Sequence, residues 1–184
     1  MRLDEISFDD EAFRAAVMAS GETEAEAVTV VRGRKQSIKS VGGVECLPNL
    51  KVLDLTRNRL SELDLSGNPH LKQLFVGNNC LEELDVSGLA ELEGLEIFMN
   101  DLEAIDLGNN PRLEVLYANA NDFAELDLSA NGQLVEVQVS DNSLKNIVLP
   151  QAVALESFWA EHNLLPDELK SSLQQQLGGC DIKL

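Results

Sequence analysis

The stretch LKVLDLTRNRLSELDLSGNPH, residues 50–70, sets the pattern for most of this chain. Its spacing returns without a gap in LKQLFVGNNCLEELDVSGLAE from Leu71, LEGLEIFMNDLEAIDLGNNPR from Leu92 and LEVLYANANDFAELDLSANGQ from Leu113. LVEVQVSDNSLKNIVLPQAVA from Leu134 and LESFWAEHNLLPDELK from Leu155 complete six segments with a period of 21 residues. One segment cannot bury its own leucines, whereas stacked copies share a continuous core. The period therefore predicts a solenoid.

Each segment begins L-x-x-L-x-L-x-x-N-x-L, and the apolar residues of its L-x-L part alternate with others, as a strand with one buried face requires. Equivalent strands of successive coils should lie side by side at about 4.8 Å. The LDLS, LDVS and IDLG stretches in the second half of the coils predict short outer strands with inward leucines. Asn68-Pro69 and Asn110-Pro111 mark turns into the next coil.

The ninth position of every segment is asparagine, where the chain leaves the strand and turns. A side-chain amide donates and accepts, so it can satisfy backbone groups stranded inside the coil. We interpret this column as a structural ladder: Asn58, Asn79, Asn100, Asn121, Asn142 and Asn163.

These segments resemble leucine-rich repeats, in the compact 21-residue form common in bacterial proteins, over roughly residues 37–169. The resemblance implies an α/β fold: a right-handed leucine-rich repeat solenoid with a parallel β-sheet on its concave face. It usually implies a binding function as well. The stretch IKSVGGVECLPNL resembles the partial first coil that precedes the repeats of internalin-like proteins, with core positions at Ile38, Val41, Val44 and Leu47.

A solenoid exposes its core at both ends, so caps are expected. DDEAFRAAVMASG predicts a short helix with Asp9 or Asp10 as N-cap, and residues 28–31 predict a strand. PDELKSSLQQQLGG predicts a C-terminal helix that begins near Pro166, and CDIKL a last strand. We therefore expect one domain with short helical caps at both ends: an N-terminal cap over residues 1–36, the partial coil and six repeats over 37–165, and a C-terminal cap over 166–184.

Positions 3, 5, 7 and 8 of each repeat should point out from the concave sheet. The only Trp, the only Tyr and two of the six Phe fall on these positions, with acidic and amide neighbours. Rings at position 5 recur two coils apart, about 9.6 Å, too far for direct stacking, so the alternative of rings that merely stiffen the sheet is less favoured. Exposed aromatic residues are typical of interface centres. The predicted partner-binding residues are Asp54, Phe75, Glu96, Phe98, Met99, Tyr117, Asn119, Gln138, Asp141, Trp159 and Glu161.

Gly94 at position 3 predicts a dip beside Phe75 and Tyr117 into which a partner side chain fits. The surrounding carboxylates favour a cationic guest that pairs with a carboxylate and lies over a ring. On the outer face Asp64, Asp85, Asp106 and Asp127 form an acidic column. We interpret this column as a solvated surface, with calcium bridging as the alternative, and expect salt to raise thermal stability by screening it.

The net charge of −18 opposes nucleic acid and anionic membranes as partners and favours a basic protein. Solubility or adaptation to salt explains this charge equally well. Three widely spaced cysteines match no metal site and favour a reducing cytoplasm. The acidic start of the chain shows no secretory signal, and no apolar run approaches a membrane span.

No phosphate-binding loop, HExxH or G-x-S-x-G motif occurs, so we expect no enzyme, no cofactor and no metal. The leading hypothesis is a cytoplasmic, monomeric interaction protein that binds a basic protein on its concave face, as a bacterial inhibitor or immunity protein. The alternatives are a secreted or cell-surface adhesion module, whose signal and anchor are missing here, and a scaffold whose repeats only hold shape.

Overall fold

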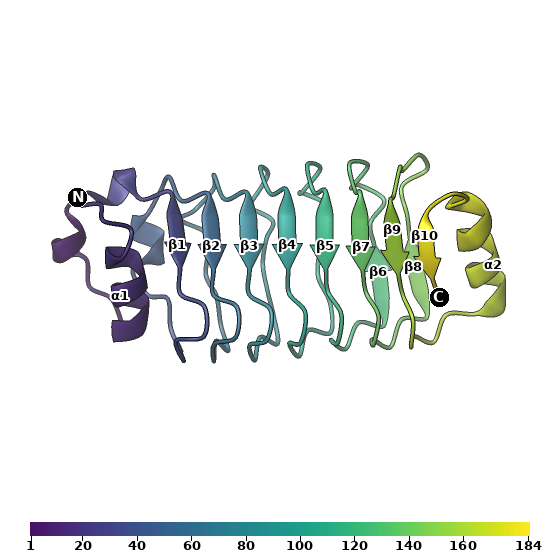
Figure 1. Ribbon diagram of the computed structural model, residues 1–184, viewed down its shortest axis with the longest axis horizontal. Helices are drawn as coiled ribbons and strands as arrows, with labels where there is room; N and C mark the ends of the chain where they lie inside the picture. Colours follow the sequence, from purple (N-terminus) through teal and green to yellow (C-terminus); the bar gives the residue numbers. More distant parts are fainter.

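The computed structural model describes residues 1–184 as one solenoid, with the N-terminus at one end and the C-terminal helix at the other (Figure 1). Eight parallel strands form a single sheet along its length, in the order β1-β2-β3-β4-β5-β7-β9-β10. This confirms the predicted fold class. The strands of this sheet are β1 (Val30–Arg32), β2 (Val52–Asp54), β3 (Gln73–Phe75), β4 (Gly94–Glu96), β5 (Val115–Tyr117), β7 (Glu136–Gln138), β9 (Ser157–Trp159) and β10 (Asp181–Lys183).

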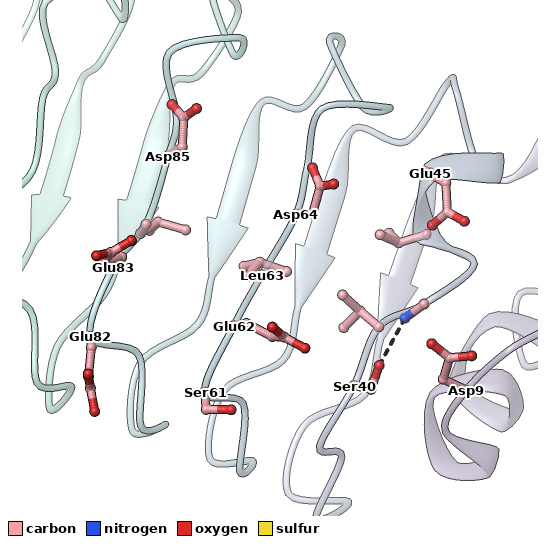
Figure 2. A pocket seen from close by; sticks show the side chains of 14 residues that line it. Asp9, Ser40, Glu45, Ser61, Glu62, Leu63, Asp64, Glu82, Glu83 and Asp85 are labelled. Atoms are coloured by element: carbon pink, nitrogen blue, oxygen red, sulfur yellow. Dashed lines mark hydrogen bonds between the residues drawn. The ribbon is translucent and has the colours of Figure 1, made fainter.

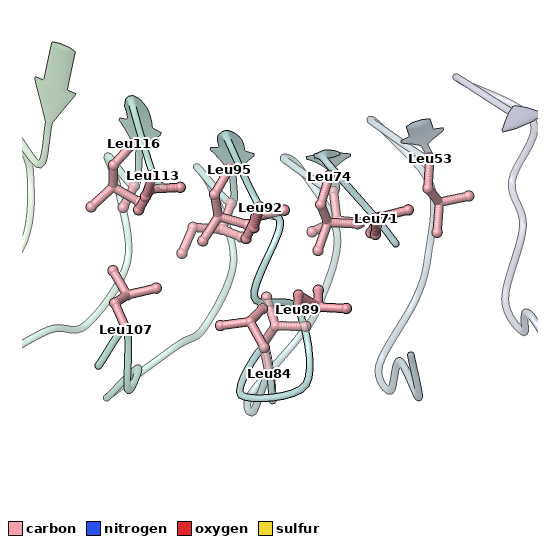
Figure 3. Packing of buried hydrophobic residues seen from close by; sticks show 14 of the residues in the cluster. Leu53, Leu71, Leu74, Leu84, Leu89, Leu92, Leu95, Leu107, Leu113 and Leu116 are labelled. Carbon is pink, nitrogen blue, oxygen red and sulfur yellow. The ribbon is translucent and has the colours of Figure 1, made fainter. Parts of the chain in front are cut away.

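The strands pair so that equivalent repeat positions meet. Leu74, for example, lies between Leu53 and Leu95 in the register of the sheet, and all three are fully buried. Figure 3 shows these leucines and their neighbours stacked in rows inside the coils. The buried apolar residues form one cluster of 47 that runs from Leu3 to Leu177, so both caps share the core of the repeats.

The prediction of an outer strand in every coil is wrong for most coils. Only β6 (Glu125–Asp127) and β8 (Asn146–Val148) form strands on the outer side, and they pair with each other. β8 contains Val148, whose branched Cβ atom favours extended backbone, whereas the four preceding coils have aspartate at the equivalent position.

The N-terminal cap is built around α1 (Glu11–Met18), whose Phe13 and Val17 are fully buried. Asp10 is the N-cap, because its Oδ1 accepts hydrogen bonds from the N–H groups of Ala12 and Phe13 at 2.9 and 3.1 Å. Its Oδ2 accepts from Lys39 N at 2.8 Å, which ties the cap to the first turn of the solenoid. Three short 3-10 helices complete this end: Leu3–Glu5, Ala25–Ala27 and Val44–Cys46.

The long sheet extends into both segments that the sequence assigns to caps. β1 pairs with β2, and β10 pairs with β9, so each cap adds one strand to the sheet. α2 (Asp167–Gln176) lies at the C-terminal end and buries Leu173, with Leu177 just after it. Neither α1 nor α2 has the length and apolar character that a membrane crossing needs.

Candidate functional site

Position 5 of each coil places one side chain on the open face of the sheet, and the register aligns these side chains in a row. We call this row the position-5 column. Its ends are basic, because Arg32 pairs with Asp54 in the register and Lys183 pairs with Trp159. Every member from β2 to β9 is half-buried: Asp54, Phe75, Glu96, Tyr117, Gln138 and Trp159.

Glu96 lies at the centre of the position-5 column, between Phe75 and Tyr117 on the neighbouring strands. Its carboxylate is half-buried and receives no hydrogen bond and no ion pair. Burial raises the pKa of Glu96, the charge of Asp54 raises it further, and Arg34 opposes the shift. A carboxylate and two aromatic rings are groups that interact favourably with a cation.

Tyr117 is fixed by a neighbour on the same face. Its hydroxyl donates a short hydrogen bond to Glu136 Oε2 on β7. This bond, with burial and the charge of Glu136, raises the pKa of Tyr117 to about 12. The phenol is therefore neutral at physiological pH, and its ring is held in place beside Glu96.

Trp159 is already covered by a cation of its own chain. Lys183 Nζ lies 3.6 Å from the centre of the indole ring, and the indole Nε1 donates to Asp181 Oδ2 at 3.1 Å. The sequence places Trp159 correctly on the open face but misses this cover, because the cover depends on β10 pairing with β9.

The predicted dip at Gly94 is wrong. Gly94 is buried, and the side chain of Gln73 on the adjacent strand fills the space that the missing side chain leaves. A Cβ on Gly94 would lie 3.1 Å from Gln73 Oε1. Gly77, at position 7 of its coil, also leaves room for a side chain of the next coil, because the ring of Phe98 lies directly against it.

The remaining predicted residues lie in the loops that follow the strands. Met99 is 52% exposed. Asn119 accepts from Ser140 N at 2.9 Å and donates to Gln138 Oε1 at 3.3 Å, and Asp141 Oδ1 lies 2.8 Å from His162 Nδ1. Phe98 and Glu161 are half-buried.

Position 7 is not always exposed to solvent. Thr56 is 2% exposed, although its hydroxyl and its N–H both donate to Asp54 Oδ1 on the open face. Position 8 always has a left-handed backbone, with φ between 53° and 60° at Arg57, Asn78, Met99, Ala120, Asp141 and His162.

The six asparagines at position 9 link neighbouring coils. Asn100 Oδ1 accepts from Leu81 N in the preceding coil at 3.1 Å. Its Nδ2 donates to Val76 O of the preceding coil at 3.1 Å and to Ile97 O of its own coil at 2.9 Å. Each of these asparagines donates to the same two kinds of carbonyl and accepts from the coil before it.

A second asparagine column was missed in the sequence. Asn68, Asn110 and Asn131 are fully buried, and each Nδ2 donates to two carbonyls of the preceding coil at 2.9–3.1 Å. Their Oδ1 atoms have no partner. The sequence signal is asparagine at position 19 in three of the repeats, and we interpret two of these, Asn68-Pro69 and Asn110-Pro111, only as turns.

The outer face carries the acidic column, and Figure 2 shows Asp64 and Asp85 at equivalent places on successive coils. Asp64 Oδ1 accepts from Ser66 N at 2.9 Å and Asp85 Oδ1 from Ser87 N at 2.8 Å, and these bonds lower the pKa of both carboxyls. Two shallow grooves of about 650 and 710 Å³ lie along this face, and seven acidic side chains line each of them. No basic side chain lines either groove.

No group of three or more His, Cys, Asp or Glu side chains is arranged to hold a metal ion. The three cysteines are free, and Cys80 is exposed. His70 lies 2.9 Å from Glu91, on the turn side of the coils.

Residues 48–91 match the family model "Leucine Rich repeats (2 copies)", which confirms the repeat assigned from the sequence. No curated protein matches the chain.

Among solved structures, the functional domain of InlJ from Listeria monocytogenes aligns over 100% of this chain with 24% identity and a TM-score of 0.81. An internalin C2 from Listeria monocytogenes aligns over 100% with 19% identity and a TM-score of 0.67, and the Leptospira interrogans protein LIC12759 over 86% with 18% identity and a TM-score of 0.64. The chain spans 46% of the InlJ domain, 49% of the Leptospira protein and 96% of internalin C2. At these identities the likeness shows a shared fold, the leucine-rich repeat solenoid.

Proposed function

We propose that this leucine-rich repeat chain is a non-catalytic module that binds a basic protein, and that Glu96 in the position-5 column takes a cationic side chain of that partner. The fold itself is typical of protein–protein interaction modules, and a solved LRIM1/APL1C complex has a related solenoid. The position of the partner and its basic nature are the parts that we infer.

The observation that carries the proposal is the unpaired carboxylate of Glu96 between Phe75 and Tyr117. A half-buried charge without a partner destabilises the free protein, so an interaction that removes this cost binds selectively here. The faces of aromatic rings attract a guanidinium or ammonium group. Because Tyr117 is held by Glu136, one wall of this site is ordered before binding.

The chain itself provides a model of such a contact. Lys183 lies over Trp159 while Asp181 accepts from the indole, so a cation, a ring and a carboxylate already meet at the end of the position-5 column. Glu96 with its two flanking rings has the same chemical groups, except for the cation. We infer that a partner supplies it.

The sharpest form of this function is a bacterial inhibitor or immunity protein acting in the cytoplasm against a basic toxin or nuclease. A net charge of −18 supports fast association with such a partner. An adhesion module at the cell surface is the second candidate, and the internalin likeness favours it at the level of the fold. A neighbouring gene for a basic toxin supports the first candidate, and a signal or wall-anchor segment in the full gene supports the second.

The test is capture of partners from source-cell lysate on the immobilised chain, followed by identification of the captured protein and remeasurement with the purified pair. We expect Glu96→Gln to weaken binding of the pair at least 10-fold, because Gln keeps the shape and removes the charge. We expect Tyr117→Ala combined with Trp159→Ala to abolish capture while the melting temperature shows a folded chain.

Glu103→Gln is the matched control, because Glu103 is an exposed carboxylate on the outer face that lines one of the acidic grooves. Equal affinity of wild type and Glu96→Gln, or equal losses with Glu96→Gln and Glu103→Gln, would show that the position-5 column is not the site.

A further inference from the structure

The loops that follow the strands carry a charge gradient along the solenoid. We call the residues at positions 7 and 8 of the coils the rim. Its composition changes from basic at the N-terminal end, through apolar in the middle, to acidic at the C-terminal end. The basic side chains are Arg34, Lys35 and Arg57, the apolar ones Phe98 and Met99, and the acidic ones Asp141 and Glu161.

The gradient is centred on Met99. Arg57 lies two coils before Met99 and Asp141 two coils after it, all at position 8. Their φ angles are 60°, 53° and 56°, so the three side chains leave the backbone in equivalent directions. All three are exposed, Met99 by 52%. Because the coils are evenly spaced at about 4.8 Å, the two charges are equidistant from Met99.

Position 7 repeats this arrangement. Arg34 lies three coils before Phe98, and Glu161 lies three coils after it. The ring of Phe98 is packed against Gly77 and therefore has a fixed place beside Met99. Arg34, Arg57 and Glu161 form no ion pair within the chain, and Asp141 uses only its Oδ1, toward His162.

We propose that the partner of the rim is a second copy of this chain, bound antiparallel about a two-fold axis at Met99. In this arrangement Arg57 of each copy faces Asp141 of the other, and Arg34 of each faces Glu161 of the other. Such an interface is isologous, so every contact occurs twice. Phe98 and Met99 of both copies form its apolar centre, the kind of centre that exposed methionine and aromatic residues mark.

The overall charge decides the conditions under which this dimer forms. Two chains of net charge −18 repel at long range, and this repulsion dominates in very dilute salt. At about 0.1 M salt the Debye length is about 10 Å, so long-range repulsion is screened while close ion pairs persist. The dimer is therefore weak, forms best at intermediate ionic strength and weakens again in concentrated salt.

A rim dimer goes beyond the proposed function and replaces the monomer expected from the sequence. It uses residues at positions 7 and 8 and does not use Glu96, Phe75 and Tyr117 of the position-5 column. The predicted partner-binding residues are thereby divided into two sites: the column for a basic protein and the rim for a second copy.

The test is sedimentation velocity at about 0.1 M salt with wild type from about 1 to about 200 µM, because dimerisation follows mass action. We expect the wild type to shift from monomer to dimer in this range. We expect Arg57→Asp and Asp141→Arg each to weaken self-association at least 10-fold, because each places like charges in contact twice.

Mixing the two variants gives the decisive result. Arg57→Asp has aspartate at both places and Asp141→Arg has arginine at both, so a one-to-one mixture pairs opposite charges twice and restores the dimer. The double variant Arg57→Asp/Asp141→Arg also restores it. Arg112→Asp, an exposed site on the turn side of the coils, is the control and leaves the dimer unchanged.

Wild type that stays monomeric throughout overturns the proposal. A dimer that is unaffected by Arg57→Asp also overturns it, because self-association would then use another face. Folded variants that do not associate when mixed would overturn the antiparallel register. Met99→Lys is a second test of the interface. It places a lysine of each copy at the two-fold axis, and the repulsion between the two lysines should weaken the dimer. None of these results affects partner binding by Glu96, so the two proposals fail independently.

Discussion

Lys183 Nζ lies 3.6 Å from the centre of the Trp159 ring, so the last strand of the sheet places a cation on the only tryptophan of the chain. The pairing of β10 with β9 brings the two residues together in register. The last strand thus fixes the end of the position-5 column, whereas the carboxylate of Glu96 at its centre has neither a hydrogen bond nor an ion pair.

Lys183→Ala uncovers the indole. We expect the tryptophan emission to shift to longer wavelength, because the ring loses the cover of the lysine stem, and we expect a loss of stability of about 0.5–1 kcal/mol, as for an exposed cation–π pair. Fluorescence and urea unfolding measure both. Lys145→Ala, at an exposed site on the outer side, should change neither. An unchanged spectrum for Lys183→Ala would show that the lysine does not cover the ring in solution.

Asn100→Ala removes four hydrogen bonds to backbone groups at a buried position. Unsatisfied buried groups cost about 1–3 kcal/mol each, so we expect a destabilisation of several kcal/mol. Asn109→Ala is the control, because Asn109 is exposed and its side chain makes no hydrogen bond. Similar unfolding midpoints in urea for Asn100→Ala and Asn109→Ala would show that the Asn100 side chain does not stabilise the fold.

Ala120→Gly tests the left-handed backbone of position 8. Ala120 has φ of 55°, a conformation that costs a residue with a Cβ about 1–2 kcal/mol and glycine little. Relief of this strain stabilises the folded chain, whereas the greater freedom of glycine in the unfolded chain offsets part of the gain. We therefore expect a net stabilisation of up to about 1 kcal/mol. Ala104→Gly, at an exposed site without positive φ, should be destabilising. A lower melting temperature for both would contradict strain at Ala120.

Glu96→Gln should stabilise the free protein at neutral pH. The pKa of Glu96 is raised in the fold, mainly by burial, so its ionised form is disfavoured there. The cost is absent below the unfolded pKa of about 4.3, grows as pH rises through the folded pKa, and is fully present above it. Melting curves of Glu96→Gln and wild type should therefore diverge at pH 7 and converge at pH below about 4. A constant difference across this range would exclude titration of Glu96 as the cause.

The acidic column should make thermal stability depend on salt. Asp64 and Asp85 occupy equivalent places on adjacent coils, and the charge of Asp85 raises the pKa of Asp64 against the effect of its turn hydrogen bonds. Charges about 5 Å apart repel by about 1 kcal/mol in water, and salt screens this repulsion. We expect the melting temperature to rise from low to moderate salt, and Asp85→Asn to show a smaller rise. An unchanged melting temperature in wild type would count against the repulsion.

The fold could be predicted because it depends on a period. One leucine in the wrong phase would leave the core, so the spacing of Leu53, Leu74 and Leu95 determines both the strands and their register. The same regularity predicts which residues reach the open face, Glu96 and Tyr117 among them. N-cap chemistry at Asp10 is local in sequence and was also predictable.

What could not be predicted depends on contacts between coils. The Gln73 side chain lies over Gly94, and the Phe98 ring lies over Gly77. Both contacts join adjacent coils, so the sequence of a single coil does not predict them. Lys183 covers Trp159 only because a strand outside the repeats joins the sheet. The buried Asn68 looks like an ordinary Asn-Pro turn, since its burial depends on the coil before it.

The position-9 asparagines all reach in one direction. Asn79 accepts from Leu60 N and donates to Leu55 O, both in the coil that precedes it, and Asn100 does the same one coil later. Each coil therefore receives its missing polar partners from the coil that follows it along the chain. During synthesis on the ribosome, where the N-terminus emerges first, every new coil would complete the one already formed. The coils can then fold one after another from α1 toward α2 during translation.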